Sequence, residues 1–196
     1  MLKVYLAKIS SYKEELLNSL NEEELAKVNR LKKEDDRIRK VLSILLLKYV
    51  LTNNSILNQA LIYNDYGKPY LKDNNLFFNI SHSNEYVVCA LSDQEVGVDI
   101  EKVRPKNDLV ISKCFSPSEQ EYIVDDSDFT KVWTLKESYI KNIGTGLKTK
   151  LNSFSTIENK EITKVSNLMF TSVQIDDYHL TICHSLGKKL KLIYLN

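Results

Sequence analysis

Near the middle of the chain lies Val96-Gly-Val-Asp-Ile-Glu101, in which apolar residues alternate with glycine or acidic residues. Side chains of a β-strand point alternately to its two faces, so Gly97, Asp99 and Glu101 share one face. The two carboxylates then lie about 6.6 Å apart along the strand, two steps of about 3.3 Å, which lets them converge on one cation. Gly97 leaves room beside them for a bulky ligand. The alternative is an acidic strand end that faces solvent.

The segments on either side of this hexapeptide follow one order twice, helices first and strands afterwards. On its N-terminal side we expect a first strand from Leu2, helices near 21–30 and 34–51, and strands at 61–63, 76–81 and 86–91. On its C-terminal side we expect a linker at 103–108, helices from 116 and over 129–142, and strands at 153–157, 169–175, 180–183 and 190–194. This order predicts an α+β fold built as a pseudo-dimer of two similar halves, 1–102 and 103–196, each an antiparallel sheet with packed helices.

Local signals support several of these boundaries. Asn21 with Glu24 three residues later has the pattern of a capping box, and Ser116 with Glu119 repeats it. Gly144 and Gly146 are expected to stop the helix over 129–142. The polar stretch Ser92-Asp-Gln-Glu95 reads as a turn and predicts that strands 86–91 and 96–101 form a hairpin.

Composition and charge exclude several classes of protein. Hydrophobic residues make up 43% of the 196 residues and charged ones 27%, which is typical of a globular protein. Lys+Arg 27 against Asp+Glu 26 gives a net charge of +1, which argues against nucleic-acid binding through overall charge. The three cysteines have no C-x-x-C spacing, so we expect reduced thiols rather than disulfides or a zinc site.

Targeting and membrane segments are not expected either. The apolar run at the N-terminus is too short for a signal peptide. The most apolar segment, Val41 to Leu51, is interrupted by Ser43 and Lys48 and is shorter than the ~20 residues of a membrane helix. The sequence therefore predicts a cytoplasmic protein that does not enter a membrane.

A second chemical signal lies on the helix over 129–142. Trp133, Glu137 and Lys141 follow one another in steps of four, so they lie close to one helix face. Glu137 can add a third carboxylate to Asp99 and Glu101, and Lys141 a positive charge for a phosphate. Mg²⁺ bound beside phosphates takes few protein carboxylates and keeps water and phosphate oxygens as its other ligands. The alternative is a surface Glu–Lys pair with the tryptophan in the core.

Hydroxyl, imidazole and basic groups supply further candidates. Phe78-Asn-Ile-Ser-His-Ser83 lies at a strand end, where Ser81 and His82 can donate hydrogen bonds to phosphate oxygens. A Ser–His nucleophile is disfavoured, because neighbours on a strand point apart and no G-x-S-x-G motif surrounds them. Lys68 projects from a Gly-Pro turn. A basic stripe follows three- and four-residue steps through Lys27, Arg30, Lys33, Arg37 and Lys40. Such a stripe is most often a solvated helix face.

Taken together, these motifs resemble the Sfp-type 4'-phosphopantetheinyl transferases, and they occur in that family's order and spacing. The matching pieces are Tyr66-Gly-Lys-Pro69, Phe78-Asn-Ile-Ser-His-Ser83, Gly97-Val-Asp-Ile-Glu101, Phe115-Ser-Pro-Ser-Glu119, and Trp133-x-x-Lys-Glu-Ser-x-x-Lys141 followed by Gly144-x-Gly-Leu147. They extend across roughly the middle half of the chain, and the N-terminal third matches more loosely through Arg30 and Asp36-Arg-Ile-Arg39.

The resemblance implies a reaction and its participants. Coenzyme A would lie in the cleft between the halves, and a serine of an apo acyl or peptidyl carrier protein would attack its β-phosphate, releasing 3',5'-ADP. Asp99, Glu101 and Glu137 fall on the family's magnesium positions, and Glu137 and Lys141 are the expected catalytic residues. The expected coenzyme A contacts are Lys27, Arg30, Arg39, Lys68, Ser81 and His82.

The resemblance also implies partners and leaves alternatives. Coenzyme A and the carrier protein are the expected partners, the protein is expected to be a monomer, and nucleic acid and membranes are not expected to bind. Glu24 stands where relatives often have a lysine near the adenosine 3'-phosphate, so Lys27 and Arg30 are expected to take that contact. A non-catalytic coenzyme A-binding module of the same fold is one alternative, and a nucleic-acid binder that uses the basic stripe is another.

Overall fold

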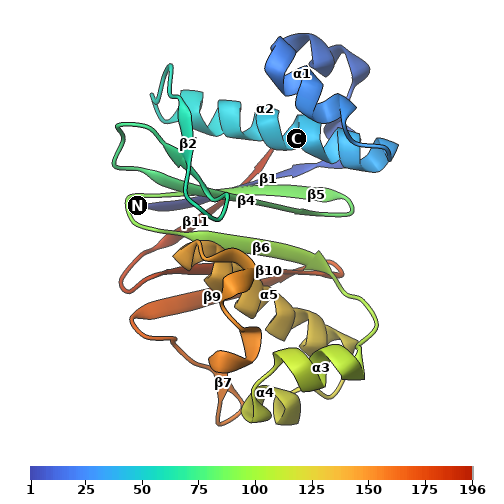
Figure 1. Ribbon diagram of the computed structural model, residues 1–196, viewed down its shortest axis with the longest axis vertical. Coiled ribbons are helices and arrows are strands. Elements are labelled where there is room, and N and C mark those ends of the chain that lie inside the picture. The colour runs from blue at the N-terminus through green and yellow to red at the C-terminus, as the bar shows by residue number, and fades with distance from the viewer. Residues whose placement is uncertain (196) are drawn as a thin grey trace.

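Four layers, helix, sheet, sheet and helix, make up the protein (Figure 1). The computed structural model describes residues 1–195, with Leu147 described by its backbone alone. The N-terminal elements are β1 (Leu2–Lys8), α1 (Glu22–Asn29), α2 (Glu34–Asn53), β2 (Leu61–Tyr63), β3 (Pro69–Leu71), β4 (Phe77–Ser83) and β5 (Tyr86–Ser92). The elements that follow are β6 (Gly97–Lys102), α3 (Asp108–Cys114), α4 (Pro117–Tyr122), α5 (Asp126–Ile143), β7 (Ile157–Glu158), β8 (Glu161–Ile162), β9 (Leu168–Ile175), β10 (Tyr178–Ser185) and β11 (Leu190–Leu195).

Local capping explains where α1, α4 and α5 begin and where α5 ends. Asn21 and Glu24 form the expected capping box at the start of α1, and Ser116 and Glu119 form the second at the start of α4. Helix α5 begins three residues before the expected start, because the Asp125 side chain accepts a hydrogen bond from the Asp128 N–H. It ends at Gly144, which has a left-handed backbone conformation with φ +67°.

The strands form two main sheets, whose pairing differs from the expectation in two places. Their orders are β11-β1-β5-β4 and β6-β10-β9. The expected hairpin of β5 and β6 is wrong: β5 pairs with β4 and β1, and β6 pairs with β10. The β4–β5 turn passes through Asn84 at φ +43°. Short local signals identified the strands, but strand partners are set by packing between distant segments.

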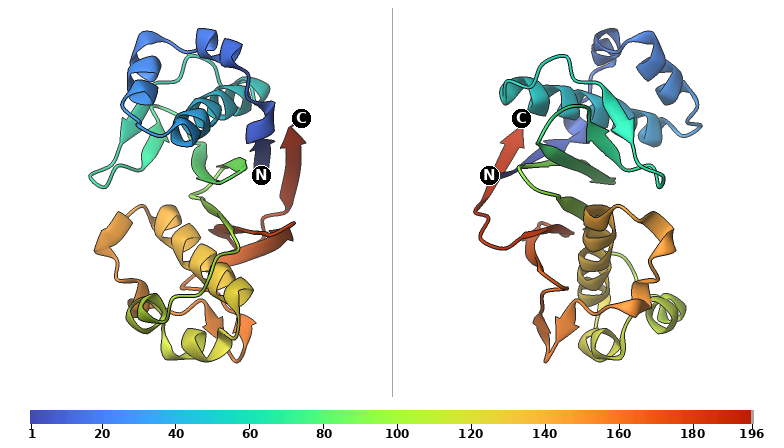
Figure 2. Two further views of the ribbon diagram at one scale, coloured as in Figure 1. Left: turned by 90° about the vertical axis from the view of Figure 1, so that its right-hand side faces the viewer. Right: turned by 60° about the vertical axis from the view of Figure 1, so that its left-hand side comes forward.

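The second difference concerns how the chain divides between the halves. The expected boundary after residue 102 puts β6 in the N-terminal half. In the structure β6 pairs with β10 and so belongs to the sheet of the C-terminal half. Strand β11 leaves that half and pairs parallel to β1 at the edge of the N-terminal sheet (Figure 2). Two similar α+β halves are nevertheless present, and the expected fold class is confirmed. Of the remaining elements, α3, β3 and β8 were not expected. In the stretch expected as a strand at 153–157, Ser153 ends a short 3-10 helix, 154–156 are irregular, and β7 begins only at Ile157.

Hydrophobic cores lie on both faces of the N-terminal sheet. Alternate residues of β1 and β5, among them Tyr5 and Val87, pack on residues of α2 such as Leu46. The opposite faces of those strands pack against Val98 and Ile100 of β6 and their neighbours on β10. The sheets therefore lie face to face, and α5 covers the outer face of the C-terminal sheet. This arrangement confirms that the apolar face of β6 is buried.

A row of side chains also joins the facing edges of the two sheets. Asn79, Ser81 and Ser83 of β4 accept hydrogen bonds from successive outward N–H groups of β6. These N–H groups belong to Val98, Ile100 and Lys102, at distances of 2.9, 3.4 and 3.2 Å. Because an edge strand otherwise leaves these donors unpaired, the row replaces a backbone ladder with side-chain bonds.

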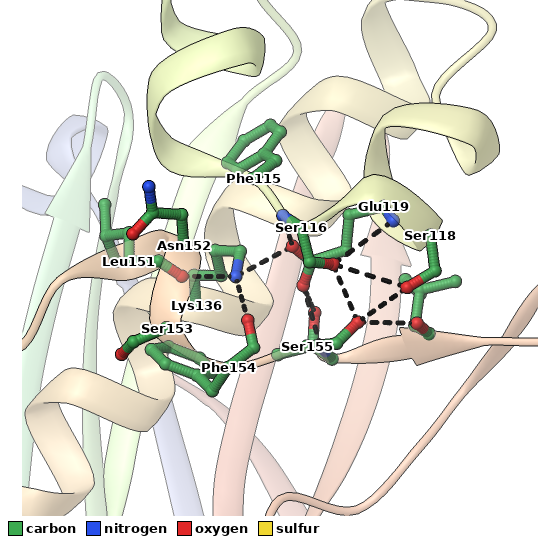
Figure 3. A network of polar contacts seen from close by, with 12 residues as sticks. Phe115, Ser116, Ser118, Glu119, Lys136, Leu151, Asn152, Ser153, Phe154 and Ser155 are labelled. Carbon is green, nitrogen blue, oxygen red and sulfur yellow. Dashed lines mark hydrogen bonds and ion pairs between the residues drawn. The ribbon is translucent and has the colours of Figure 1, made fainter.

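A buried ion pair anchors α5 to α4 and to the segment before β7 (Figure 3). The Lys136 ammonium lies 2.8 Å from the Glu119 carboxylate, and neither side chain is exposed. Lys136 also donates to the carbonyls of Leu151 and Phe154, at 2.6 and 2.8 Å. The carboxylate accepts further bonds from the backbone N–H of Ser116 and from Thr156. The pair thus ties α5 to α4 and to the segment before β7.

Candidate active site

The acidic face of β6 lies directly against α5. A β-carbon at Gly97 would come within 2.0 Å of the Ser138 carbonyl oxygen and 2.4 Å of the Asn142 nitrogen. The expectation that Gly97 leaves room for a ligand is therefore wrong, because the backbone of α5 fills that space. The close approach instead brings Glu137 and Lys141 of α5 beside Asp99 and Glu101.

Asp99 is the most deeply buried of the site carboxylates. One oxygen, Oδ1, accepts hydrogen bonds from Lys141 Nζ at 2.6 Å and from the Ser81 hydroxyl at 2.8 Å. The other, Oδ2, is buried and has no hydrogen-bond partner among the described atoms. A buried carboxylate oxygen without a donor is costly. Such an atom is suited to bind a cation.

Glu101 and Glu137 lie beside Asp99, and we use the name acidic wall for these three carboxylates. Glu101 and Glu137 line a cavity of about 320 Å³ whose other lining residues are Ile80, Ser81, His82, Asp99, Trp133 and Lys141. Burial raises the pKa of both glutamates above the ordinary value, and the charge of Asp99 raises it further. The Ser83 hydroxyl donates to Glu101 at 2.8 Å. Glu137 thus has an environment that favours holding a proton or a cation.

The carboxylates are not gathered into a finished metal centre. Among residues 1–195, no group of three or more His, Cys, Asp or Glu side chains is positioned to hold a metal ion. The Lys141 ammonium lies where it neutralises Asp99. The donor set still fits Mg²⁺, because three carboxylates line one cavity and Asp99 Oδ2 lacks a partner.

Two further cavities extend the site toward the N-terminal helices. One of about 510 Å³ has an apolar floor that includes Ile44, Leu47 and Phe78 and is bordered by lysines. An adjoining cavity of about 490 Å³ is lined by Lys27, Arg30, Leu31, Asp36, Lys40 and His82. An apolar pocket next to a cluster of cations suits a base attached to phosphates.

The structure brings some of the expected coenzyme A contacts together. Lys27, Arg30 and His82 line the cationic cavity. Burial lowers the pKa of His82, and the nearby charges of Lys141 and Arg39 lower it further. Lys40 lines both cavities. Sequence reasoning placed Lys40 in the basic stripe without choosing it as a contact, although its spacing from Lys27 and Arg30 was the available signal.

Three other expected contacts use their polar groups elsewhere. Arg39 is bonded to Asp36 at 2.6 Å and to the Asn84 carbonyl at 3.3 Å. The Ser81 hydroxyl donates to Asp99, so it is committed to the acidic wall. The Lys68 ammonium is buried against Glu95 and the Asn142 carbonyl, and Lys68 does not line any of the three cavities described above. Sequence reasoning did not select Arg104, whose guanidinium lies 5.0 Å from the Trp133 ring centre.

Comparison with known proteins identifies the family. A family model described as 4'-phosphopantetheinyl transferase, N-terminal, matches residues 9–94, and one described as 4'-phosphopantetheinyl transferase superfamily matches residues 95–188. The chain is 34% identical over 152 residues to 4'-phosphopantetheinyl transferase Sfp of Bacillus subtilis (strain 168), covering 72% of this chain and 68% of that protein. This chain belongs to the 4'-phosphopantetheinyl transferase family. The expected family and enzyme class are confirmed.

Other members of the family show similar coverage. The chain is 37% identical over 139 residues to 4'-phosphopantetheinyl transferase gsp of Aneurinibacillus migulanus, which covers 66% of this chain and 58% of that protein. It is 30% identical over 161 residues to 4'-phosphopantetheinyl transferase HetI of Nostoc sp. (strain PCC 7120 / SAG 25.82 / UTEX 2576), with 74% and 68% covered. Within the described residues of this phosphopantetheinyl transferase, no helix has the length and apolar character needed to cross a membrane.

Proposed function

We propose that this phosphopantetheinyl transferase moves the 4'-phosphopantetheine group of coenzyme A to a serine of an apo acyl or peptidyl carrier protein, with Mg²⁺. In this reaction the serine oxygen forms a bond to the β-phosphorus, the bond to the bridging pyrophosphate oxygen breaks, and 3',5'-ADP leaves. The observation that carries the proposal is the cavity lined by Asp99, Glu101, Glu137 and Lys141 beside the apolar and cationic cavities.

The proposal assigns Mg²⁺ to the three carboxylates of that cavity. Asp99 offers its unpartnered Oδ2, and Glu101 and Glu137 offer carboxylates that burial has made costly to keep charged alone. Bound there, Mg²⁺ would neutralise charge on the two phosphates as the leaving group departs. The requirement for the metal follows from the charge balance, since Lys141 is the one lysine or arginine among the residues that line this cavity, against three carboxylates and a pyrophosphate.

The residues of α5 supply the proposed proton and charge chemistry. Lys141 would direct its ammonium to a pyrophosphate oxygen, which stabilises charge that increases in the transition state. Glu137, or a water that it holds, would accept the serine proton. In the absence of the metal, burial and the charge of Asp99 raise the pKa of Glu137.

Recognition of the nucleotide is proposed for the N-terminal cavities. The adenine would enter the apolar cavity, and the 3'-phosphate would lie among Lys27, Arg30 and Lys40. Dephospho-coenzyme A should therefore bind at least about tenfold more weakly than coenzyme A, which corresponds to ~1.4 kcal/mol. Lys40→Ala should reduce that difference. Equal binding of the two ligands to the wild-type protein would refute this assignment of the 3'-phosphate.

A turnover assay tests the proposed reaction. Purified protein, coenzyme A, Mg²⁺ and several apo carrier proteins are mixed, and mass spectrometry detects the phosphopantetheinyl carrier. We expect transfer that stops on chelation of the metal and with a carrier whose acceptor serine is replaced by alanine. Tight coenzyme A binding without transfer to any carrier would favour the non-catalytic coenzyme A-binding module.

We also propose that the protein is a monomer and that it is located in the cytoplasm. Light scattering checks the monomeric state.

A further inference from the structure

Lys68 belongs to a group of contacts that joins a turn of the N-terminal half to the end of α5. Its ammonium is ion-paired with Glu95 and donates to the Asn142 carbonyl at 2.6 Å. The Tyr70 ring centre lies 5.3 Å from the same nitrogen. Only 6% of the side chain is exposed. Because an ammonium has three donors, these neighbours leave little of it for a phosphate.

A second set of bonds fastens the same turn to the same helix end. The Asn64 side-chain amide donates to the Gly144 carbonyl at 2.8 Å, while its oxygen accepts from the N–H groups of Tyr66 and Lys68. Asn142 in turn donates to the carbonyls of Glu95 and Cys183. We use the name helix-end clamp for Asn64, Lys68, Glu95, Asn142 and Gly144.

The clamp suits the end of a helix for physical reasons. The last carbonyls of a helix lack internal partners and carry a partial negative charge, so a cation there is favourable. Lys68 supplies that cation to Asn142. A side chain at Gly144 would displace the clamp, because a β-carbon there would lie 2.9 Å from Lys68 Cδ and 3.1 Å from the Asn64 amide nitrogen.

The clamp lies one residue from the chemistry. Lys141 precedes Asn142 directly, and Glu137 is one turn earlier on the same helix. A cavity of about 350 Å³ is lined jointly by the turn, through Gly67 and Lys68, and by Glu137, Lys141 and Gly144 of the helix segment. The spacing of turn and helix therefore sets the width of this cavity and the direction of Lys141.

We propose that Lys68 is a positioning residue: through the helix-end clamp it holds α5 so that Lys141 and Glu137 face the reacting pyrophosphate, and it does not bind coenzyme A itself. This inference rests on the proposed function for the identity of the reaction. It replaces the expectation that Lys68 contacts the phosphates. A phosphate ligand would act on binding, whereas a positioning residue acts on the rate after binding.

The test compares Lys68→Met with Lys72→Met, a control with the same substitution at an exposed lysine just past β3. Calorimetry gives coenzyme A affinity, and single-turnover transfer at saturating coenzyme A gives the rate. We expect Lys68→Met to change affinity less than about threefold and to slow transfer at least about tenfold. Lys72→Met should change neither. Weaker binding with an unchanged saturated rate would overturn the proposal, and so would no change in either quantity.

Hydrogen exchange provides a readout that does not depend on activity. Amides of the last turn of α5 should exchange at least about tenfold faster in Lys68→Met, with amides of β10 unchanged. Equal exchange at the helix end would overturn the clamp even if the protein transferred nothing. A wild-type protein without transfer would instead count against the proposed function alone. If Lys68→Met fails to fold, two milder variants test the clamp: Asn64→Ala removes the side-chain bonds to Gly144, Tyr66 and Lys68, and Glu95→Gln removes the charge that pairs with Lys68. Both should show the same separation of rate from affinity.

Discussion

Replacing Lys136 by methionine should be among the most destabilising single changes on α5. The substitution keeps the unbranched stem and removes the ammonium, which leaves Glu119 charged, buried and short of one partner (Figure 3). Removing one member of a buried pair usually costs about 3–5 kcal/mol. Two features place the expected loss inside that range. Glu119 keeps its bonds from Ser116 and Thr156, and the freed carbonyls of Leu151 and Phe154 lie on half-buried residues that water can reach.

Urea unfolding followed by circular dichroism measures this loss. A reduction of about 4 kcal/mol corresponds to a fall in Tm of roughly 8–16 °C for a chain of this size. Lys131→Met is the matched control on the same helix, since within residues 1–195 its ammonium donates only to the Tyr122 hydroxyl, at 2.8 Å. The control should lose less than about 1.5 kcal/mol.

The pair itself can be isolated by a double-mutant cycle. Lys136→Met and Glu119→Gln should each destabilise, and the double variant should lose less than the sum of the two by at least about 1 kcal/mol. A loss for Lys136→Met no larger than that of the control, or additive effects in the cycle, would refute the view that this pair anchors α5.

Three further predictions concern the site. Gly97→Ala should reduce the free energy of unfolding by at least about 2 kcal/mol, because the new β-carbon meets helix backbone at 2.0 Å; wild-type stability in urea would contradict the close approach. Glu137→Gln should bind coenzyme A within about tenfold by calorimetry and transfer at least about a hundredfold more slowly in single turnover; lost binding with an unchanged saturated rate would show that Glu137 only holds the substrate. The pKa of Glu137 is raised above 4.5, so the native state binds more protons than the unfolded state, and the stability contributed by this group falls as pH rises. In the metal-free protein, Glu137→Gln should therefore gain on the wild type between pH 4.5 and neutrality, and a pH-independent difference in urea unfolding would contradict the raised pKa.

Sequence reasoning succeeded where a few adjacent residues decide the structure. Both capping boxes, the end of α5 at Gly144 and the alternation in β6 depend on neighbours within one turn or one strand. The close grouping of Asp99, Glu101, Glu137 and Lys141 was also expected, because each pair lies on one face of its element and the resemblance joined the two elements.

Sequence reasoning failed where contacts between distant segments of the chain determine the structure. Glycine at position 97 is typical both of room for a ligand and of close packing, and only the position of α5 distinguishes them. Lys68 looked available in a turn, yet Glu95 and Asn142 surround it once the halves meet. Strand β5 pairs with β1 and β4 rather than with β6. The turn-like segment Ser92–Glu95 does not indicate which strands pack beside β5.

The pairing of β11 with β1 has a consequence for how the protein folds. Leu2 lies beside Leu190, so β1 gains its parallel neighbour only after all the residues between these two strands have been synthesised. Contacts of such long sequence separation slow folding, because the entropy of closing the chain between the two strands is lost before their pairing stabilises the protein. On the ribosome, β1 must wait with one edge open, which favours pairing with other chains. A piece of this protein that ends before β11 should therefore aggregate rather than fold as an independent N-terminal half.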